Sequence, residues 1–172
     1  KVSQVITRPK NFFFINTYLP LKADFRLQLK LGQIPKLWTS TPAPESPPDS
    51  TGIREWKWKE QHDPEEFSIV ARYMIPKYMP KVYLEGYQRL INCIHEQPWP
   101  AEPKGIFTSC AYNSDDVFKA WAAERVEKGS PLVIGQHGGH YGIGLWSFTE
   151  DHEIAISTSY LSYGWSESSQ EK

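Results

Sequence analysis

The stretch "GIFTSCAYNSDDVFKAWAAERVEKGSPLVIGQHG", residues 105–138, decides the fold. It opens with "GIFTS" and closes with "PLVIGQHG", two short runs rich in β-branched and aromatic residues that predict strands. Between them, "YNSDDVFKAWAAERVEKG" predicts a helix with Asn113 or Ser114 as its N-cap, acidic residues in its first turn and Gly129 as its stop. A strand, a helix and a second strand at this spacing are typical of a parallel sheet covered by helices.

Further elements extend this unit on both sides. Downstream, "EDHEIAIS" predicts a short helix and "YLSYGW" another strand, so residues 105–165 are expected to form a β-α-β-α-β unit. Upstream, "NFFFINT" (11–17) predicts a buried strand, and a helix follows it up to Gly32. We therefore expect an α/β fold in a single domain over residues 1–172, with a Rossmann-like parallel sheet flanked by helices.

The helix after the first predicted strand carries two stripes, each repeating every four residues. We expect the apolar stripe to face the core and the basic stripe to form a ridge beside it. The stripes are Leu21, Phe25 and Leu29, and Lys22, Arg26 and Lys30. Residues 1–38 hold seven Lys or Arg against one acid, a balance of +6, whereas the whole chain carries −1. This basic segment fits either a solvated helix face or a phosphate-bearing or acidic ligand.

The middle of the chain predicts a loop followed by two helices. "TSTPAPESPPDSTG" (39–52) is rich in proline and predicts a surface loop, and "IREWKWKE" (53–60) predicts a short exposed strand. Asp63 is the expected N-cap of a helix that ends at Pro76, and a second helix begins near Pro80. We expect each helix to bury an apolar face. The faces are Phe67, Val70, Ala71, Met74 and Ile75, and Tyr83, Leu84, Tyr87, Leu90, Ile91 and Ile94.

Composition and charge exclude several classes of protein. Apolar residues make up 40 % of the 172 residues, which is enough to build a core and argues against disorder. The net charge of −1 argues against a general nucleic-acid binder, and no apolar run reaches the length of about 18 residues that predicts a membrane span. Cys93 and Cys110 form no CxxC pair, which favours a reduced, cytoplasmic protein. Because the chain starts without Met and ends in a polar tail, we expect it to be part of a longer protein.

Candidate functional residues follow the ends of the predicted strands. The loop "GQHGGHYGIG" (135–144) follows one strand, "TSCAYNS" (108–114) lies at the end of the preceding strand, and "NTYLP" (16–20) at the end of the first. Ligands of open α/β sheets bind beyond the carboxyl ends of the strands. If these strands are neighbours, their loops line a single crevice.

The loop with the two histidines admits four interpretations. His137 could act as a general base, because imidazole titrates near neutral pH. His137 and His140 could bind a metal together with His152 or Glu153, the glycines could cradle a phosphate, or the loop could be a turn with a structural histidine. No HExxH or GxxxxGK[ST] motif supports the metal or phosphate interpretation.

Other polar residues near the predicted strand ends have equally simple structural explanations. Ser109 and Asn113 could donate hydrogen bonds to a phosphate at a helix N-terminus, but helix capping accounts for them as well. Glu85 in "YLEGY" fits an acid on a helix surface better than a catalytic acid.

Four stretches of the chain together resemble a known family. They are "NTYLPLKADFRLQLKLGQIPKLW" (16–38), "IPKYMPKVYLEGY" (75–87), "FTSCAYNSDDVFKAWAAERVEKGSPLVIGQHGGHYGIG" (107–144) and "EDHEIAISTSYLSYGWS" (150–166). The family comprises transferases of bacterial O-antigen and surface-polysaccharide gene clusters, and the resemblance covers nearly the whole chain apart from the proline-rich loop. IGQHGGHYG and YLEGY are its most specific parts. The QHG segment is also similar to an HG motif of capsule glycosyltransferases and teichoic-acid glycerophosphotransferases, in which the histidine is a candidate catalytic base.

This resemblance implies one half of a two-domain glycosyltransferase of the GT-B type, with little activity on its own. It implies transfer of a sugar from a nucleotide sugar to a glycan or lipid-linked acceptor, without a bound cofactor or metal. His137 is the implied catalytic base. The implied substrate-binding residues are Gln136, Gly138, Gly139 and His140, joined by Ser109, Asn113, Lys22 and Arg26.

The basic residues would meet a phosphorylated ligand or the anionic inner face of the membrane. A metal-dependent hydrolase built on His137, His140 and His152, and a binding domain without catalysis, are the alternatives.

Overall fold

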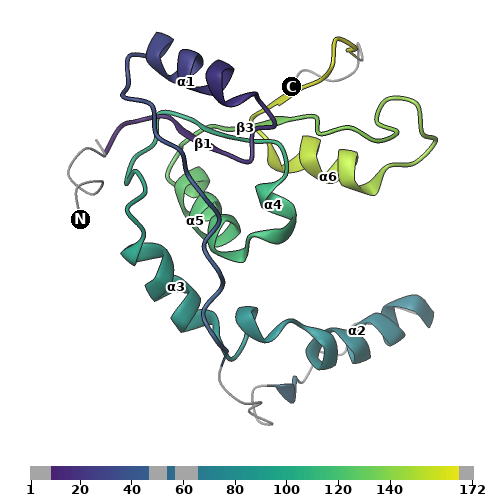
Figure 1. Ribbon diagram of the computed structural model, residues 1–172. Helices are drawn as coiled ribbons and strands as arrows, with labels where there is room; N and C mark the ends of the chain where they lie inside the picture. The colour runs from purple at the N-terminus through teal and green to yellow at the C-terminus, as the bar shows by residue number, and fades with distance from the viewer. Residues whose placement is uncertain (1–8, 47–53, 57–65, 167–172) are drawn as a thin grey trace. The chain divides into compact units, whose positions relative to one another are not determined.

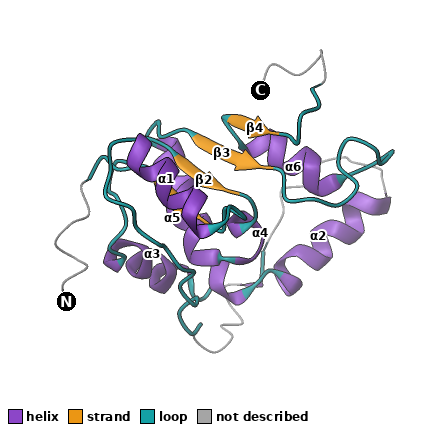
Figure 2. Ribbon diagram, turned by 45° about the horizontal axis from the view of Figure 1, so that its top comes forward, coloured by secondary structure: helices purple, strands orange, loops and turns teal. Residues whose placement is uncertain are grey.

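The computed structural model describes residues 9–46, 54–56 and 66–166 (Figure 1). The chain forms two compact units, one of residues 1–42 and 97–172 and the other of residues 43–96. The first unit holds a four-stranded sheet in which all strands are parallel and follow the order of the sequence. The strands are β1 (Phe13–Ile15), β2 (Ile106–Thr108), β3 (Leu132–Gly135) and β4 (Ser159–Leu161). Figure 2 shows β2, β3 and β4 side by side. The predicted α/β class with a parallel sheet is confirmed.

One face of the sheet forms the core of this unit. The alternate strand residues that share this face are almost completely buried, among them Phe13, Ile106 and Ile134. The Phe13 ring packs against two rings of α5 (Asp116–Glu127), with centroids 4.5 Å from Trp121 and 6.3 Å from Phe118. The aromatic run around β1 forms a strand that is buried on both faces: Phe13 and Ile15 contribute to this core, and the Phe14 ring packs 5.9 Å from the Phe107 ring on the other face.

Two helices, in place of the single helix predicted, lie between β2 and β3. α4 (Ala111–Ser114) comes first and α5 follows. The N-cap residue of α4 is Cys110, and Thr108 Oγ1 accepts from the Ala111 N–H at 2.9 Å. The prediction that Asn113 or Ser114 caps the long helix is therefore wrong, since both belong to α4. The N-cap of α5 is Asp115, whose Oδ1 accepts from the Phe118 N–H at 2.8 Å. Gly129 ends α5 as predicted, with a φ of +91° and its N–H bonded to the Val126 carbonyl.

The inward face of α1 (Leu21–Lys30) is polar, so the prediction that its apolar stripe faces the core is wrong. Leu21 and Leu29 are 54 % and 62 % exposed, whereas Asp24 and Gln28 are buried. In Figure 1 this helix lies above the sheet and α5 lies below it. Gly32 ends α1 as predicted, with a φ of +75°.

Backbone groups explain why the polar stripe of α1 turns inward. Gln28 donates to the Asp24 carboxylate at 2.6 Å and accepts from the Lys36 N–H at 2.9 Å. Gln33, just after the helix, exchanges two hydrogen bonds with the backbone of Phe12 beside the edge strand. These side chains satisfy buried or edge groups that leucine could not, and this need outweighs the burial of a leucine stripe.

The second unit holds α2 (Glu66–Tyr78), the 3₁₀ turn η3 (Lys81–Tyr83) and α3 (Tyr87–Glu96). The prediction that Pro76 ends the first helix is wrong, because α2 continues to Tyr78 with Pro76 as its buried residue. The predicted buried face of α2 is also wrong, because its large apolar residues lie open to solvent and Phe67 is 78 % exposed. In α3 the predicted burial of Leu90 and Ile94 is confirmed.

An arginine organises the second unit. The Arg54 guanidinium makes a two-pronged ion pair with the Glu85 carboxylate, at 2.6 and 2.8 Å. Its Nη1 also donates to the carbonyls of Pro76 and Lys77 in the last turn of α2 and to that of Met79 just after it. Glu85 is thus not a helix-surface acid but a buried partner in the turn between η3 and α3, which is why no single helix runs from Pro80.

Part of the predicted middle region lies outside the described residues. Residues 39–46 of the proline-rich segment have no helix or strand, and residues 54–56 form no strand. Residues 47–53 and 57–65, which include the expected cap Asp63, are outside the described ranges. Among the helices that the structure describes, none is long and apolar enough to cross a membrane.

Candidate functional site

The carboxyl ends of β1, β2 and β3 meet at one edge of the sheet. The Ser109 N–H donates to the Asn16 carbonyl at 3.0 Å, and the Ser109 hydroxyl donates to the Thr17 carbonyl at 3.2 Å. The Tyr18 ring lies 6.4 Å from the His137 ring. The three loops predicted from the sequence to share a crevice are therefore neighbours, because their strands are adjacent in the sheet.

His137 faces a buried carboxylate at this edge. It comes two residues after the end of β3, and its Nδ1 lies 3.3 Å from Oε1 of Glu153 on α6 (Phe148–Ile156). The two atoms are at ion-pair distance without the alignment of a hydrogen bond. The His137 side chain is 29 % exposed, whereas the Glu153 side chain is fully buried. The imidazole thus lies at the border between solvent and a buried acid.

Two tyrosines hold the Glu153 carboxylate. The hydroxyls of Tyr112 on α4 and of Tyr141 in the loop after β3 both donate to Oε1, the latter at 2.7 Å. Burial, reinforced by the Glu153 carboxylate, raises the pKa of Tyr141 to about 12. Burial and the same carboxylate also raise the pKa of Tyr112. Both hydroxyls therefore keep their protons at neutral pH and remain donors to the acid.

The loop after β3 depends on glycines and on Gln136. Gly138 and Gly139 have φ values of +116° and +87°, which favour glycine, and no atom would crowd a Cβ at either position. The Gln136 side chain is buried, and its Oε1 accepts from the Tyr163 N–H at 2.9 Å and from the indole N–H of Trp165 at 3.0 Å. Gln136 thus fastens the segment after β4 to the loop that carries His137.

Backbone strain marks the end of β1 beside His137. Asn16 and Tyr18 have φ values of +47° and +55°, a left-handed conformation that is uncommon outside glycine. This conformation places Tyr18, 64 % exposed, beside the imidazole. A side-chain hydrogen bond with Cys110 raises the pKa of Tyr18. Strained residues of this kind cluster at ligand sites, because the surrounding structure holds them in place for a purpose other than stability.

Comparison with known proteins gives the reaction class. The family model described as LIC12162 family transferase matches residues 1–172. The chain belongs to this transferase family. No curated protein and no solved structure matches the chain. The LIC12162 family assignment agrees with the transferase family that the sequence resembles, at the level of reaction class.

The remaining candidates of this LIC12162 family transferase divide into two groups. Ser109 lies at the strand edge, and its side chain is used in a hydrogen bond to the β1 loop. Asn113, Lys22 and Arg26 are exposed to solvent, and neither basic side chain forms an ion pair with any described residue.

The three histidines of the metal interpretation do not converge. His140 is exposed beside Tyr141, and His152 packs on the Tyr112 ring at 6.1 Å. In the part of the chain that the structure describes, no three His, Cys, Asp or Glu side chains lie close enough together to hold a metal ion.

Sequence reasoning missed the tyrosines of the site. It named His137 and weighed Glu153 beside it, but not Tyr112, Tyr141 and Tyr18. The signal available was position, because each of these tyrosines lies in one of the three segments that follow strand ends. Their common partner could not be found from the sequence, because Glu153 lies 41 and 12 residues from the two tyrosines that bind it.

Proposed function

We propose that this chain forms half of a GT-B-type glycosyltransferase, which moves a sugar from a nucleotide-activated donor to a hydroxyl of a glycan or lipid-linked acceptor in O-antigen or surface-polysaccharide synthesis. The family supplies the reaction class. The donor, the acceptor and the two-domain arrangement come from the resemblance of the IGQHGGHYG and YLEGY segments. The observation that carries the proposal is the pairing of His137 with the buried Glu153 at the carboxyl edge of the sheet.

His137 fits the role of a general base. When a hydroxyl attacks the sugar carbon, its proton must leave as the new C–O bond forms, while the bond to the nucleotide diphosphate breaks and its electron pair leaves with the phosphate. One nitrogen of His137 faces Glu153, so Nε2 is the nitrogen that takes the proton from the acceptor. The resulting positive charge would lie 3.3 Å from the Glu153 carboxylate, which stabilises it.

The N-terminus of α1 suits the diphosphate of the donor. No side chain caps it, and it starts three residues after Tyr18 beside His137. The N–H groups at a helix N-terminus and the helix dipole favour an anion, and the first turn of α1 holds the exposed Lys22 and one acid, the buried Asp24. Arg26 lies one turn further along the exposed ridge.

The exposed face of α1 also suits a peripheral contact with the anionic inner face of the membrane. Lys22, Arg26 and Lys30 lie beside the exposed Leu21 and Leu29. Basic and apolar residues together are the combination by which a helix lies on an anionic lipid surface.

The test is an activity assay on the complete gene product, since a second half is part of the proposal. The protein is incubated with a panel of nucleotide sugars and glycan acceptors, and nucleotide release and the mass of the glycan product are measured. We expect His137→Ala to lower turnover by about 10²–10⁴-fold, the usual contribution of general-base catalysis. Far-UV circular dichroism checks that the variant is folded.

His152→Ala is the matched control, because His152 lies on the exposed face of α6 and forms no ion pair with any residue that the structure describes. The proposal predicts that it turns over sugar at the parent rate. Full turnover in His137→Ala would rule out His137 as the base. Metal-dependent release of a hydrolysed product that is lost in both histidine variants would establish the hydrolase alternative instead.

A further inference from the structure

A cavity lies beside the loop that carries His137. Its volume is about 390 Å³, within the range of small-molecule sites. The loop after β3, α6 and the segment after β4 form its walls. The lining residues used here are Gly142, Gly144, Glu150, Asp151, Ile154 and Trp165.

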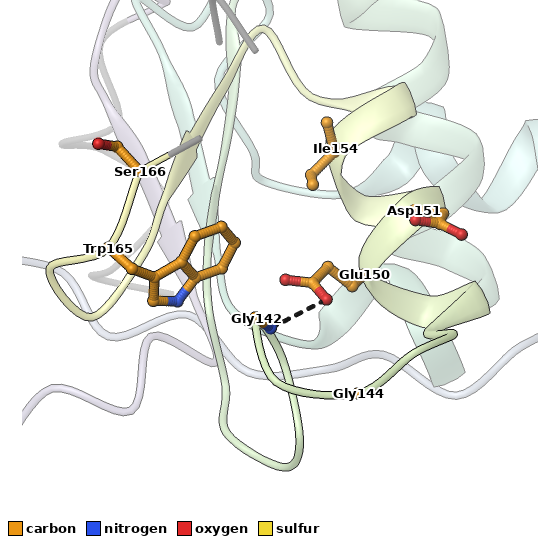
Figure 3. A pocket seen from close by; sticks show the side chains of 7 residues that line it. All are labelled: Gly142, Gly144, Glu150, Asp151, Ile154, Trp165 and Ser166. Carbon is orange, nitrogen blue, oxygen red and sulfur yellow. Dashed lines mark hydrogen bonds between the residues drawn. The ribbon is translucent and has the colours of Figure 1, made fainter. Parts of the chain in front are cut away.

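Glu150 brings a buried acceptor without a partner to this cavity. The residue is 9 % exposed, and its Oε2 accepts from the Gly142 N–H at 3.2 Å. Its Oε1 is buried and has no hydrogen-bond partner among the residues that the structure describes. Figure 3 shows the carboxylate directed into the space between α6 and Trp165. A buried carboxylate oxygen without a donor destabilises the folded chain. A ligand that donates a hydrogen bond to this oxygen would therefore bind more tightly.

Trp165 supplies an apolar wall opposite this acid. Its indole lies across the cavity from Glu150, with Ile154 beside them (Figure 3). The ring is held on two sides. Its N–H donates to Gln136, and Gly142 lies so close to the ring that a Cβ added to this glycine would be 3.1 Å from Cε2 of the indole. A rigid indole binds flat apolar surfaces without losing much conformational freedom.

A sugar ring combines the two groups that this cavity accommodates. The C–H face of a pyranose packs on an indole, and its hydroxyls donate to a carboxylate. An anion is disfavoured, because Glu150 and Asp151 are both acidic and the lining residues that the structure describes include no Lys or Arg. A quaternary ammonium is usually held by a cage of several aromatic rings, and Trp165 is the only aromatic residue among the described lining residues.

We propose that this cavity binds one uncharged sugar ring, stacked on Trp165 with its hydroxyls donating to Glu150. The inference rests on the proposed function in one respect, which is that the bound ring belongs to the glycan or donor that His137 serves. Glu150 and Glu153 lie one turn apart on α6, and the groups that donate to them, the Gly142 N–H and the Tyr141 hydroxyl respectively, belong to consecutive residues. The two sites therefore share the same loop and the same helix.

Nuclear magnetic resonance on the ¹⁵N-labelled 172-residue chain tests the proposal. Trp165→Phe identifies the indole N–H signal of Trp165 by its disappearance. The parent chain is then titrated with methyl glucoside, methyl galactoside, methyl mannoside and N-acetylglucosamine. We expect at least one of them to shift the Trp165 indole signal and the Gly142 amide signal in a saturable way. Glu150→Gln should weaken that affinity about tenfold, the loss expected for a hydrogen bond to a charged group.

Trp146→Ala is the matched control, because Trp146 is in the same loop, is 84 % exposed and does not line the cavity. It should bind the sugar as the parent does. Three results would overturn the proposal: no saturable shift with any glycoside, equal affinity in Glu150→Gln, or a shift produced only by inorganic phosphate or tetramethylammonium. His137→Ala separates the two proposals, because it should keep sugar binding while it loses turnover, so either can fail without the other.

Discussion

Glu153 is the residue on which the candidate site depends. A buried carboxylate costs several kcal/mol in lost hydration unless donors compensate it, and here the hydroxyls of Tyr112 and Tyr141 both donate to Oε1, while Oε2 has no partner among the described residues. His137 meets the same oxygen from the solvent side. This arrangement assigns Glu153 a positioning role, in which it orients the imidazole and stabilises its charged form without contact with the substrate.

Glu153→Gln tests that role. The amide keeps the shape and one acceptor but removes the charge, so we expect kcat to fall about tenfold or more while KM for the acceptor changes little. Steady-state kinetics on the complete gene product measure both, and Glu153→Asp, which restores the charge, should recover part of kcat. A rise in KM with kcat unchanged would contradict the positioning role and indicate a binding role.

At the residue scale the sequence led to His137 and offered Glu153 beside it, but it did not lead to the tyrosines of the site. His137 stands out because glycines surround it after a strand, and local pattern is sufficient to find it. Its partner Glu153 lies on α6 and accepts from Tyr112 of α4, and only the folded chain brings these elements together. The sequence did not single out Glu150 or Trp165 either. Locally, Glu150 is explained as an acid at a helix start and Trp165 as an aromatic residue of a strand.

At the element scale, the start of α5 is a prediction that a single substitution tests. Asp115→Ala removes the acceptor for the Phe118 N–H and should lower the free energy of unfolding by about 1 kcal/mol. Asn113→Ala should change it by less than about 0.5 kcal/mol, because Asn113 is exposed and lies in α4. Urea unfolding followed by circular dichroism measures both, and a larger loss in Asn113→Ala would restore the cap expected from the sequence.

The inward face of α1 gives a second prediction at this scale. Gln28→Ala leaves the Lys36 N–H and the Asp24 carboxylate without their buried partner, and we expect a loss of about 1–3 kcal/mol in unfolding free energy. Leu29→Ala should have little effect, because Leu29 is 62 % exposed. Thermal unfolding of the two variants provides the comparison. The reverse order would mean that the leucine stripe is the buried face after all.

The sheet was predictable because its strands repeat a local pattern, whereas the faces of the helices were not. Short β-branched runs between caps and glycines identify β1, β2 and β3 from the sequence alone. Periodicity places Leu21 and Leu29 on one face of α1, but it cannot decide which face turns inward when a polar stripe satisfies backbone groups. The same limit applies to α2, whose apolar residues are exposed.

At the scale of the whole molecule, the buried tyrosines make the free energy of unfolding fall at high pH. An unfolded tyrosine loses its proton near pH 10. In the folded chain burial and nearby acids raise the pKa of Tyr112 and Tyr160, and burial raises that of Tyr141 to about 12. The folded state therefore binds more protons than the unfolded state above about pH 10, and stability, unaffected below that pH by these groups, must fall as the pH rises toward 12.

Urea unfolding between about pH 8 and pH 11.5 measures this fall. Tyr141→Phe removes one of the titrating groups, so its stability should decline less steeply than that of the parent above about pH 10, even though its stability at neutral pH is lower. Parallel curves for the two proteins would mean that Tyr141 ionises alike in both states.

The register of the sheet sets the order in which the molecule assembles. Partners in β2 and β3 are 26 positions apart (106 and 132), as are those in β3 and β4 (133 and 159), but partners in β1 and β2 are 93 apart (13 and 106). Closing the longer loop costs about 1 kcal/mol more. We expect β2, β3 and β4 to pair first and the amides of Phe14 and Ile15 to gain protection last in pulsed hydrogen exchange. Tyr18 and the helix that follows it would then reach His137 only in the final step, so the crevice is the last part of the molecule to form.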